Sequence, residues 1–578
     1  MMMRMIIGWA RPARRGCAGS GPVRAQKAGI AGRGWGAARC WPFRARGTGR
    51  VRAAWLIAVL VWLTLGARPV LAQVPATERE GAAALGLALR QLGVTARVLM
   101  VGAHPDDENT ALLAELALAR GADVAYLSLT RGDGGQNGIG GELGEALGVL
   151  RTEELLAARR LDGARQYFTR AYDYGYSKSA EEAFRQWPRD SVLADVVAVV
   201  RRFRPDVVLS IFSGTAWDGH GQHQATGQLV REAFDAAGDA SRFPEQLERG
   251  LRPHRPAKLY QALWRSAAGD GVVVETGGFD ALLGRSPYQV AMESRSRHRS
   301  QDMGRAAEPG AHASVLRAVV PAPDGSPAAG DVFAGVPVAL RERVAAGSPA
   351  RAPLAAYDSL AAALRRDARL LEPASLVPEL ARAIALLEAA DATLAAEGER
   401  GDDARFHVAA ELEQARSALA RAGGVVLDVV ASRKRVTPGG EVVLELVLWN
   451  GGAAPLVVRE AAPALPPGWE AVAEPARSAA AEPARGGAAT AGSAAPGGAP
   501  AAAVAAASFA APVRLEPGAV LRQRYRVRLP ADARPTEPYF LREPRAGELY
   551  RWPDDPAVRG LPFEPPAVRG RAVVELAG

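Results

Sequence analysis

Short apolar runs that alternate with helical patterns constrain the fold of this 578-residue chain more than any other feature. The run VLMV at 98–101 is typical of a strand buried on both faces of a sheet, and the run DVVLSIF at 206–212 repeats that pattern. Repeated β–α units of this kind predict an α/β fold, with a Rossmann-like, mostly parallel sheet and helices on both faces. We expect strands near 98–101, 124–129, 166–169, 207–212, 258–264 and 271–275, and helices near 110–120, 147–161 and 191–203.

Side chains that bind metals or move protons follow two of these strands. His104, Asp106 and Asp107 come directly after the first run, and His220 and His223 come after the second. Because ligand sites in open α/β sheets lie beyond the carboxyl ends of the strands, we expect the two loops to meet. Taken alone, the first group also fits a solvated acidic turn, and a single histidine is more often structural. Together, His104, Asp107 and His223 suit one Zn²⁺ per chain and leave Asp106 free to act on a water molecule.

Several longer motifs surround these residues. They are AHPDDE at 103–108, LTRGDGG at 129–135, an R-x-x-E helix start at 151–154, H-x-x-H at 220–223 and SRSRHRSQDMG at 294–304. With them, the segment 97–304 resembles the PIG-L (LmbE-like) family of zinc-dependent deacetylases, of the larger secreted type with a C-terminal β-sandwich. The resemblance implies that His104, Asp107 and His223 bind zinc and that Asp106 is the general base. It also implies an N-acetylated sugar or glycoconjugate as substrate.

The second histidine motif leaves one role open. Zinc lowers the pKa of a bound water towards about 7, and Asp106 is placed to accept its proton. His220 is then predicted either to stabilise the oxyanion or to protonate the leaving amine. Many family members have Pro-Asp between the two histidines, whereas this chain has Gly221 and Gln222. Gln222 supplies no negative charge beside the imidazoles, and Asp218 is the candidate to replace it.

Four other polar residues are predicted to contact substrate: Arg131, Arg151, Asp218 and His298. The alternative for the two arginines is turn chemistry and a solvated helix start. For His298 the alternative is an ordinary surface histidine.

Residues 1–72 have the pattern of a signal peptide, which predicts a secreted or periplasmic protein. The segment is arginine-rich, has no acidic residue, and ends in an apolar run at 53–67 followed by Val-Leu-Ala. A membrane anchor is the alternative, but about fifteen apolar residues fall short of the roughly 20 that span a bilayer. Removing the leader takes away 13 basic residues, so the formal net charge changes from +9 to −4, and both cysteines are lost. We therefore expect no nucleic-acid partner, no membrane span after cleavage and no thiolate metal site.

The remaining chain is divided by composition. We predict a catalytic domain at 86–304, a Pro/Gly/Ala-rich linker at 305–349 and packed helices at 350–422. Alternating apolar residues then predict an immunoglobulin-like β-sandwich at 425–578, with a disordered insert at 473–511. This β module is expected to take no part in the chemistry.

These features favour a secreted zinc amidohydrolase that removes acetyl from N-acetylglucosamine-type substrates. Two alternatives stay open, namely an amidase that cuts a larger amide conjugate and a non-catalytic carbohydrate-binding surface protein. An intact ligand set argues against the last, because a binding protein does not need Asp106.

Overall fold

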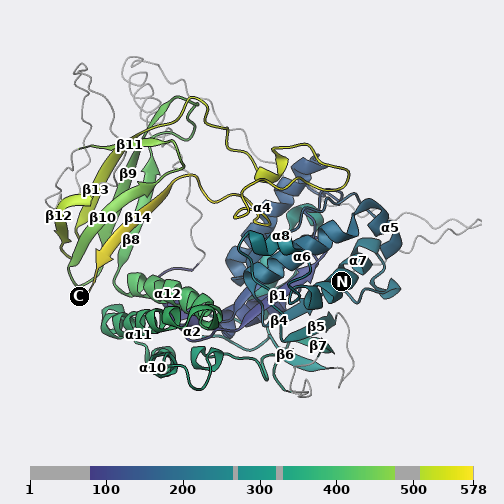
Figure 1. Ribbon diagram of the computed structural model, residues 1–578, viewed down its shortest axis with the longest axis horizontal. Helices are drawn as coiled ribbons and strands as arrows, with labels where there is room; N and C mark the ends of the chain where they lie inside the picture. Colours follow the sequence, from purple (N-terminus) through teal and green to yellow (C-terminus); the bar gives the residue numbers. More distant parts are fainter. Residues whose placement is uncertain (1–78, 264–270, 321–329, 475–507, 577–578) are drawn as a thin grey trace, which may run out of the picture. The chain divides into compact units, whose positions relative to one another are not determined.

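A computed structural model describes residues 79–263, 271–320, 330–474 and 508–576 (Figure 1). Its central sheet has seven strands in the order β3-β2-β1-β4-β5-β7-β6. The strands are β1 Arg97–Gly102, β2 Asp123–Ser128, β3 Arg165–Phe168, β4 Val207–Ser210, β5 Lys258–Leu263, β6 Val272–Glu275 and β7 Ala313–Val320. The first five pair in parallel, and β7 pairs antiparallel with both β5 and β6. The predicted α/β fold with a mostly parallel sheet is confirmed.

Helices cover both faces of this sheet (Figure 1). They are α3 Thr110–Ala114, which continues as a π-helical turn to Ala119, α4 Glu145–Asp162, α5 Ala180–Gln186, α6 Arg189–Phe203, α7 Gly221–Ala236, α8 Pro244–Glu248 and α9 Pro287–Arg295. Alternate side chains of β1 pack into two different hydrophobic cores, one on each face of the sheet. Leu99 and Val101 share a core with apolar residues of α6 and α7, whereas Val98 and Met100 share one with residues of α3. Burial on both faces explains why β1 is a continuous apolar run.

The segment predicted as a linker contains β7, so that prediction is wrong for residues 313–320. The strand pairs Val315 with Leu263 of β5 and Ser314 with Val274 of β6. Because the surrounding residues are rich in Pro, Gly and Ala, the sequence pattern did not indicate this eight-residue strand, which lies between β5 and β6. Residues 321–329 lie outside the described part of the chain.

The predicted helical segment forms three long helices: α10 Arg351–Asp367, α11 Val377–Ala396 and α12 Asp402–Ala422. A fourth helix, α2 Gly81–Gln91, begins before the predicted domain boundary and shares their core. Leu89 of α2 is buried in one cluster with Leu354, Leu380 and Val408. None of the helices in the described ranges has the length and apolarity needed to cross a bilayer.

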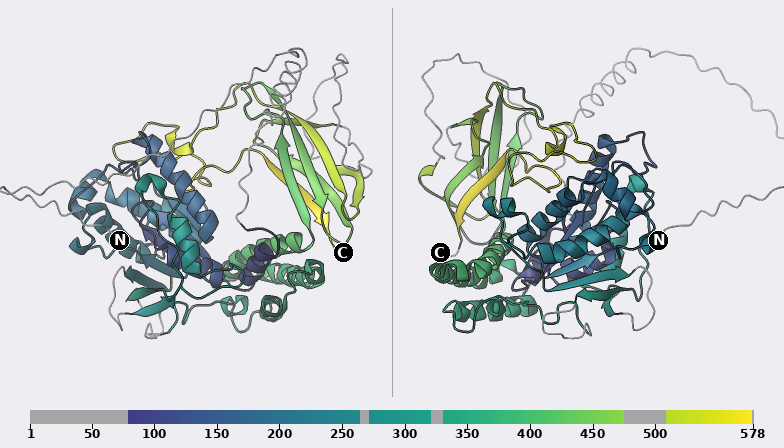
Figure 2. Two further views of the ribbon diagram at one scale, coloured as in Figure 1. Left: turned by 180° about the vertical axis from the view of Figure 1, so that it is seen from behind. Right: turned by 45° about the vertical axis from the view of Figure 1, so that its right-hand side comes forward.

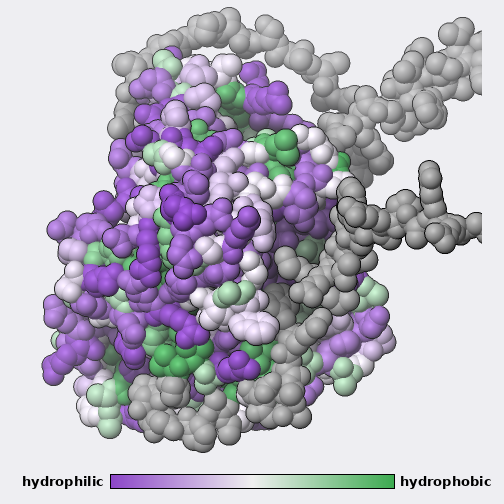
Figure 3. Space-filling view, turned by 90° about the vertical axis from the view of Figure 1, so that its right-hand side faces the viewer, coloured by the Kyte–Doolittle hydropathy of each residue, from purple (hydrophilic) through white to green (hydrophobic). Residues whose placement is uncertain are grey.

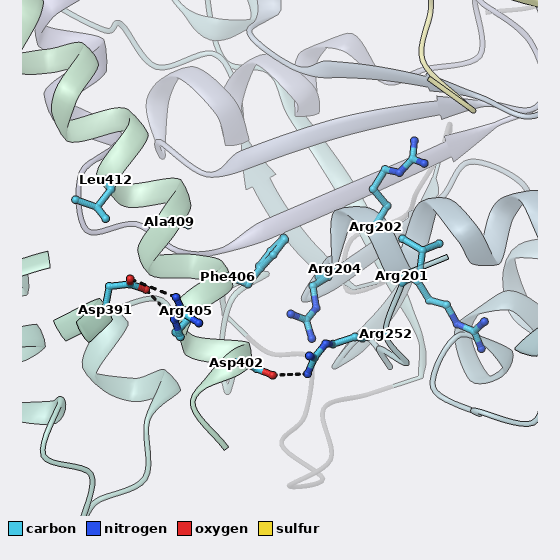
Figure 4. Close-up of a pocket in the computed structure, with 12 residues that line it drawn as sticks. Arg201, Arg202, Arg204, Arg252, Asp391, Asp402, Arg405, Phe406, Ala409 and Leu412 are labelled. Atoms are coloured by element: carbon cyan, nitrogen blue, oxygen red, sulfur yellow. Dashed lines mark hydrogen bonds and ion pairs between the residues drawn. The ribbon is translucent and has the colours of Figure 1, made fainter. Parts of the chain in front are cut away.

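A groove of about 510 Å³ lies between α12 and the α/β domain (Figure 4). Arginine–aspartate pairs line it, with Arg252 2.6 Å from Asp402 and Arg405 2.9 Å from Asp391. Arg204 also approaches the next residue of α12, Asp403, at 3.1 Å. Because these arginines form ion pairs with aspartates, we interpret the groove as part of the packing interface between α12 and the α/β domain.

The C-terminal part forms two antiparallel sheets, in the orders β11-β13-β9-β8 and β12-β10-β14 (Figure 2). The strands are β8 Val425–Ala431, β9 Glu441–Asn450, β10 Leu456–Ala464, β11 Glu470–Ala473, β12 Ser508–Leu515, β13 Val520–Arg528 and β14 Arg569–Glu575. Leu446 of β9, Val527 of β13 and Val458 of β10 share one core, as the predicted sandwich requires. Most of the predicted disordered insert, residues 475–507, lies outside the described residues, and its flanks belong to β11 and β12.

Between β13 and β14 the chain leaves the sandwich and runs along the α/β domain (Figure 2). Leu549 forms an antiparallel bridge with Ala171, the Tyr550 N–H donates to the Arg170 carbonyl at 2.8 Å, and the Phe168 N–H donates to the Gly560 carbonyl at 2.9 Å. We call residues 538–563 the C-terminal strap. It covers the outer side of the edge strand β3, which would otherwise present unpaired backbone groups. The prediction that residues 425–578 form only a sandwich is therefore wrong for this segment.

The molecular face in Figure 3 is mainly hydrophilic, with apolar side chains in small separate groups. This distribution is normal for a surface in contact with water.

Candidate metal centre

The loop after β1 folds back on itself and brings Asp107 beside His104. The carboxylate of Asp107 accepts hydrogen bonds from the backbone N–H groups of Ala103 at 2.9 Å and His104 at 2.7 Å. The Tyr126 hydroxyl of β2 donates to the His104 carbonyl at 2.6 Å. A side chain at Gly102 would collide with this tyrosine, since an added Cβ would lie 2.3 Å from its hydroxyl oxygen. Only glycine therefore lets β1 end so close to Tyr126.

The structure brings the three predicted metal ligands together. Nδ1 of His104 lies 3.3 Å from Oδ2 of Asp107, and Nε2 of His223 lies 3.4 Å from Oδ1 of Asp107. The two histidine nitrogens are 3.2 Å apart. A tetrahedral ion about 2.0–2.1 Å from each ligand atom separates those atoms by about 3.3–3.4 Å. The donor set and its spacing therefore fit one zinc-sized cation.

Both histidine rings are oriented by hydrogen bonds at their far nitrogens. Nε2 of His104 lies 2.7 Å from Oε1 of Gln222, and Nδ1 of His223 lies 3.3 Å from the Asp218 carbonyl. Each partner is an acceptor, so the far nitrogen carries the proton and the near nitrogen presents its lone pair. Gln222 donates in turn to Asp173 at 3.3 Å and to the Gly175 carbonyl at 3.0 Å.

Sequence reasoning missed this role of Gln222. It treated the glutamine only as the loss of a charge from the motif. The position of Gln222 beside His223 was the one available signal, since the first turn of the helix lies next to the loop that carries His104.

Without a metal, the charged groups of the buried cluster shift one another's pKa values. Burial alone would raise the pKa of Asp107, but the charges of His223 and His104 hold it well below its usual range. Burial would lower the pKa of His104, yet the charge and hydrogen bond of Asp107 outweigh burial and raise that pKa to about 9. His104 and Asp107 thus stabilise each other's charged forms in the metal-free cluster.

Asp106 does not belong to the group of side chains that could hold a metal ion. Burial raises the pKa of Asp106, and the neighbouring charge of Asp107 adds to the rise. Within the described ranges its carboxylate accepts no hydrogen bond, although the positive charge of Arg151 partly offsets the rise in its pKa. A carboxylate that is free of partners and holds a proton more readily than usual is suited to general-base work.

His220 caps the start of α7 above the two histidine ligands. Its Nδ1 accepts a hydrogen bond from the Gln222 N–H at 3.0 Å, so the neutral ring carries its proton on Nε2. Its ring centre is 5.2 Å from that of His104 and 4.9 Å from that of His223. Burial and these two imidazoles lower the pKa of His220 to about 3. Of the two roles left open by the sequence, this geometry favours a hydrogen-bond donor to an oxyanion.

The predicted substrate-contacting residues separate into different environments. Arg151 is buried beside the site, where its guanidinium donates to the Gln136 carbonyl at 2.5 Å. The carboxylate of Asp218 accepts from the N–H groups of Ser213 at 3.0 Å and Gly214 at 2.7 Å, so it shapes the loop after β4. Asp218 therefore acts on His223 through its carbonyl and does not replace the missing charge beside His220.

His298 lies behind the metal loop and is fully buried, so the surface alternative for this histidine is wrong. Its Nε2 is 2.9 Å from Oε1 of Glu108, and Arg159 reaches the same oxygen at 3.1 Å. In this position His298 holds Glu108, the residue that follows Asp107, and its buried ring is not accessible to a substrate.

Arg131 is also fully buried, and it holds the C-terminal strap. Its guanidinium donates to the carbonyls of Pro562 at 2.9 Å and Leu561 at 3.2 Å. The same group lies 3.5 Å from the ring centre of Phe540 and 4.2 Å from that of Phe168. Arg131 therefore makes structural contacts with a distant part of the chain and does not face an open pocket.

Two exposed aromatic residues beside His220 were not predicted. Tyr176 is 70% exposed, and its ring centre is 4.9 Å from that of His220. Trp217 is 96% exposed in the short 3₁₀ turn Ala216–Asp218, just before His220. In the sequence, the only signal for this arrangement was the position of Trp217, three residues before His220.

Comparisons with known proteins found one matching family and several similar enzymes. The family described as PIG-L: GlcNAc-PI de-N-acetylase matches residues 99–234. The chain is 32% identical over 199 residues to a 1D-myo-inositol 2-acetamido-2-deoxy-alpha-D-glucopyranoside deacetylase of Rhodococcus jostii, covering 31% of this chain and 66% of the relative. It is 28% identical over 177 residues to a mycothiol S-conjugate amidase of Streptomyces coelicolor, covering 28% and 59%. The chain thus spans slightly less than two thirds of these relatives.

Among solved structures, the chain is similar to an N,N'-diacetylchitobiose deacetylase from Pyrococcus horikoshii. The identity is 22% and the TM-score is 0.28, over 36% of this chain and 70% of that one.

Proposed function

Residues 99–234 form a PIG-L family domain, and from that premise we propose that the chain is a zinc-dependent N-deacetylase acting on N-acetylglucosamine-type sugars or their conjugates. The observation that carries the proposal is the cluster of His104, Asp107 and His223, in which the candidate ligand atoms, one from each residue, lie within 4.8 Å of one another. Asp106 and His220 flank this cluster with free proton-handling groups, which a purely structural metal site does not need.

The protein's own residues supply the proton transfers in this proposal. His104, Asp107 and His223 hold the ion, which when bound polarises the amide carbonyl and makes a water acidic near pH 7. Asp106 takes a proton from the attacking water and returns it to the amide nitrogen as the C–N bond breaks. His220 donates a hydrogen bond from its Nε2–H to the carbonyl oxygen as negative charge develops there and keeps its proton. The products are acetate and the protonated amine.

The surroundings of His220 support a sugar substrate. Tyr176 and Trp217 offer flat, exposed faces on which the C–H side of a pyranose ring can pack. The Rhodococcus relative is named for a 2-acetamido sugar, and the Streptomyces relative is named as an amidase of a mycothiol S-conjugate. An amidase acting on a larger amide conjugate is therefore the second candidate function.

We also propose that the protein is exported. This rests on the leader pattern of residues 1–72, which lie outside the described residues, and on the loss of both cysteines and the net positive charge with that leader.

Acetate release by the purified protein tests the activity. The metal-free protein and the protein reloaded with Zn²⁺ are each given N-acetylglucosamine, its β-linked oligomers and an N-acetylglucosaminyl inositol, with an N-acyl conjugate of longer chain as a comparison. We expect zinc-dependent acetate release from at least one N-acetylated sugar. Zinc binding without any amide hydrolysis would contradict an enzymatic function and favour the carbohydrate-binding alternative. Cleavage of the long-chain conjugate alone would favour the amidase.

A further inference from the structure

We propose that the C-terminal strap positions the metal centre, with Tyr550 as a positioning residue that acts on His104 through Asp133, Asp173 and Gln222. The inference rests on the metal site of the proposed function. It assigns the strap a role beyond covering an edge strand.

A chain of hydrogen bonds runs outward from His104. Oε1 of Gln222 accepts from Nε2 of His104 at 2.7 Å, which fixes the ring that presents Nδ1 to the metal. The amide nitrogen of Gln222 donates to Oδ1 of Asp173 at 3.3 Å. The backbone N–H of Asp173 donates to Oδ2 of Asp133 at 3.4 Å. Finally, the hydroxyl of Tyr550 donates to the other oxygen of Asp133 at 2.5 Å. A continuous hydrogen-bonded path therefore joins the strap to a metal ligand.

Every side chain along this path is buried. Asp133, Asp173 and Gln222 are each at most 3% exposed, and the hydroxyl end of the path is enclosed with Tyr550 at 2%. Buried polar groups keep one arrangement only while their partners are present. Without the Tyr550 hydroxyl, one oxygen of the Asp133 carboxylate loses its donor inside the protein, which costs more than the bond itself contributes. Asp133 is then expected to move, and the loop that carries Asp173 loses its fixed acceptor.

The strap is also locked to the loop that carries Asp133. Arg131, two residues earlier in that loop, is held between the rings of Phe540 and Phe168 and donates to the strap carbonyl of Pro562. Gly132 of the same loop lies against Pro105, since an added Cβ would be 3.0 Å from the proline Cδ. The strap thus supports the loop after β2 from one side, and that loop borders the metal motif on the other.

The inference is tested by measuring the Zn²⁺ affinity of the protein through equilibrium competition with a chromophoric chelator. Tyr550→Phe removes the donor and keeps the ring, and we expect it to weaken Zn²⁺ binding by about three- to tenfold, less than the loss of a direct partner of a ligand. Tyr525→Phe is the matched control. Tyr525 is a buried tyrosine of β13 whose hydroxyl donates to the Ala461 carbonyl inside the sandwich, away from the strap and from the path to His104. Its removal should change the Zn²⁺ dissociation constant by less than about twofold.

A double mutant separates positioning from general loosening of the fold. In a Gln222→Ala background the path is already cut, so adding Tyr550→Phe should weaken Zn²⁺ binding no further. An equal loss in both backgrounds would overturn the path through Gln222. Unchanged affinity in Tyr550→Phe, with a lower unfolding temperature of the metal-free protein, would overturn the inference and leave the strap a purely structural element. If the unaltered protein itself failed to bind Zn²⁺, the proposed function would fail instead.

Discussion

Oε1 of Gln222 lies 2.7 Å from Nε2 of His104, so the residue that departs from the usual H-P-D-H pattern is the one that orients a metal ligand. An aspartate at this position would bring a negative charge to the imidazoles. Glutamine brings a neutral acceptor to His104 and, through its amide nitrogen, a donor to Asp173 and Gly175. The departure therefore keeps an oriented ligand while leaving His220 without an adjacent carboxylate from its own motif.

Gln222→Ala should weaken Zn²⁺ binding by about 10–100-fold, because outer partners of histidine ligands typically contribute that much. Gln228→Ala is the control on the same helix, since Gln228 binds the Gly214 carbonyl and not a ligand. Isothermal titration of the metal-free proteins with Zn²⁺ measures both. Equal affinities in the two variants would mean that the contact between Gln222 and His104 does not support the metal.

His104→Ala and His223→Ala should each remove most of the bound metal, because each variant leaves two ligands where three are needed. Metal content after dialysis against a weak chelator, measured by plasma emission spectrometry, gives the result. His254→Ala serves as the control, since His254 binds the Pro205 carbonyl at 2.8 Å away from the cluster. Full metal content in both ligand variants would contradict the assigned site.

Asp106→Asn should keep its metal and lose about 10²–10⁴-fold in kcat, the usual contribution of a general base. Asparagine preserves the size of the side chain and cannot accept the proton. Steady-state acetate release at matched zinc occupancy is the measurement. A variant within a few-fold of the original rate would remove Asp106 from the mechanism.

Tyr176→Ala and Trp217→Ala should raise KM for an N-acetylated sugar by several-fold, with a smaller change in kcat, because they remove packing area for the sugar ring and leave the proton-transfer groups in place. Trp449→Ala is the control, since Trp449 is an exposed tryptophan on β9 of the sandwich. An unchanged KM in both site variants would mean that the substrate does not rest on these rings.

Local patterns in the sequence were enough to predict the parallel sheet and to predict that His104, Asp107 and His223 lie together as a group that could hold a metal ion. The strands at 98–101 and 207–210 are apolar, and the loops that follow them carry these residues, so both loops reach the same edge of the sheet. The environment of Arg131 was not predictable in this way. Its strap partners lie up to 431 residues further along the chain, and no periodicity links them.

The buried position of His298 and the strand β7 were also not predictable from local sequence patterns. The buried partner of His298 is Glu108, 190 residues away, so an Arg/Ser-rich sequence around it indicated a surface position. β7 is a single strand between stretches rich in Pro, Gly and Ala, and only its pairing with β5 and β6 distinguishes it from a loop.

Glu411 provides a prediction that concerns stability alone. Its carboxylate is buried on α12, where it accepts from the Gly93 N–H at 2.9 Å and from the Tyr357 hydroxyl. Burial raises the pKa of Glu411 to about 7, while these two donors oppose the rise. Because the folded protein then binds more protons than the unfolded chain between about pH 4.5 and 7, its free energy of unfolding falls as the pH rises through that window.

Glu411→Gln should remove this loss, since a glutamine oxygen accepts both hydrogen bonds without a buried charge. The two proteins should unfold with similar free energies at pH 4.5. At pH 8 the variant should be more stable by up to about 3 kcal/mol, the equivalent of the rise in pKa from 4.5 to about 7. Urea unfolding at both pH values measures the difference, and Glu413→Gln, an exposed position on the same helix, should show no pH-dependent gain. Equal stability of Glu411→Gln and the unaltered protein at pH 8 would mean that Glu411 carries no costly charge in the folded state.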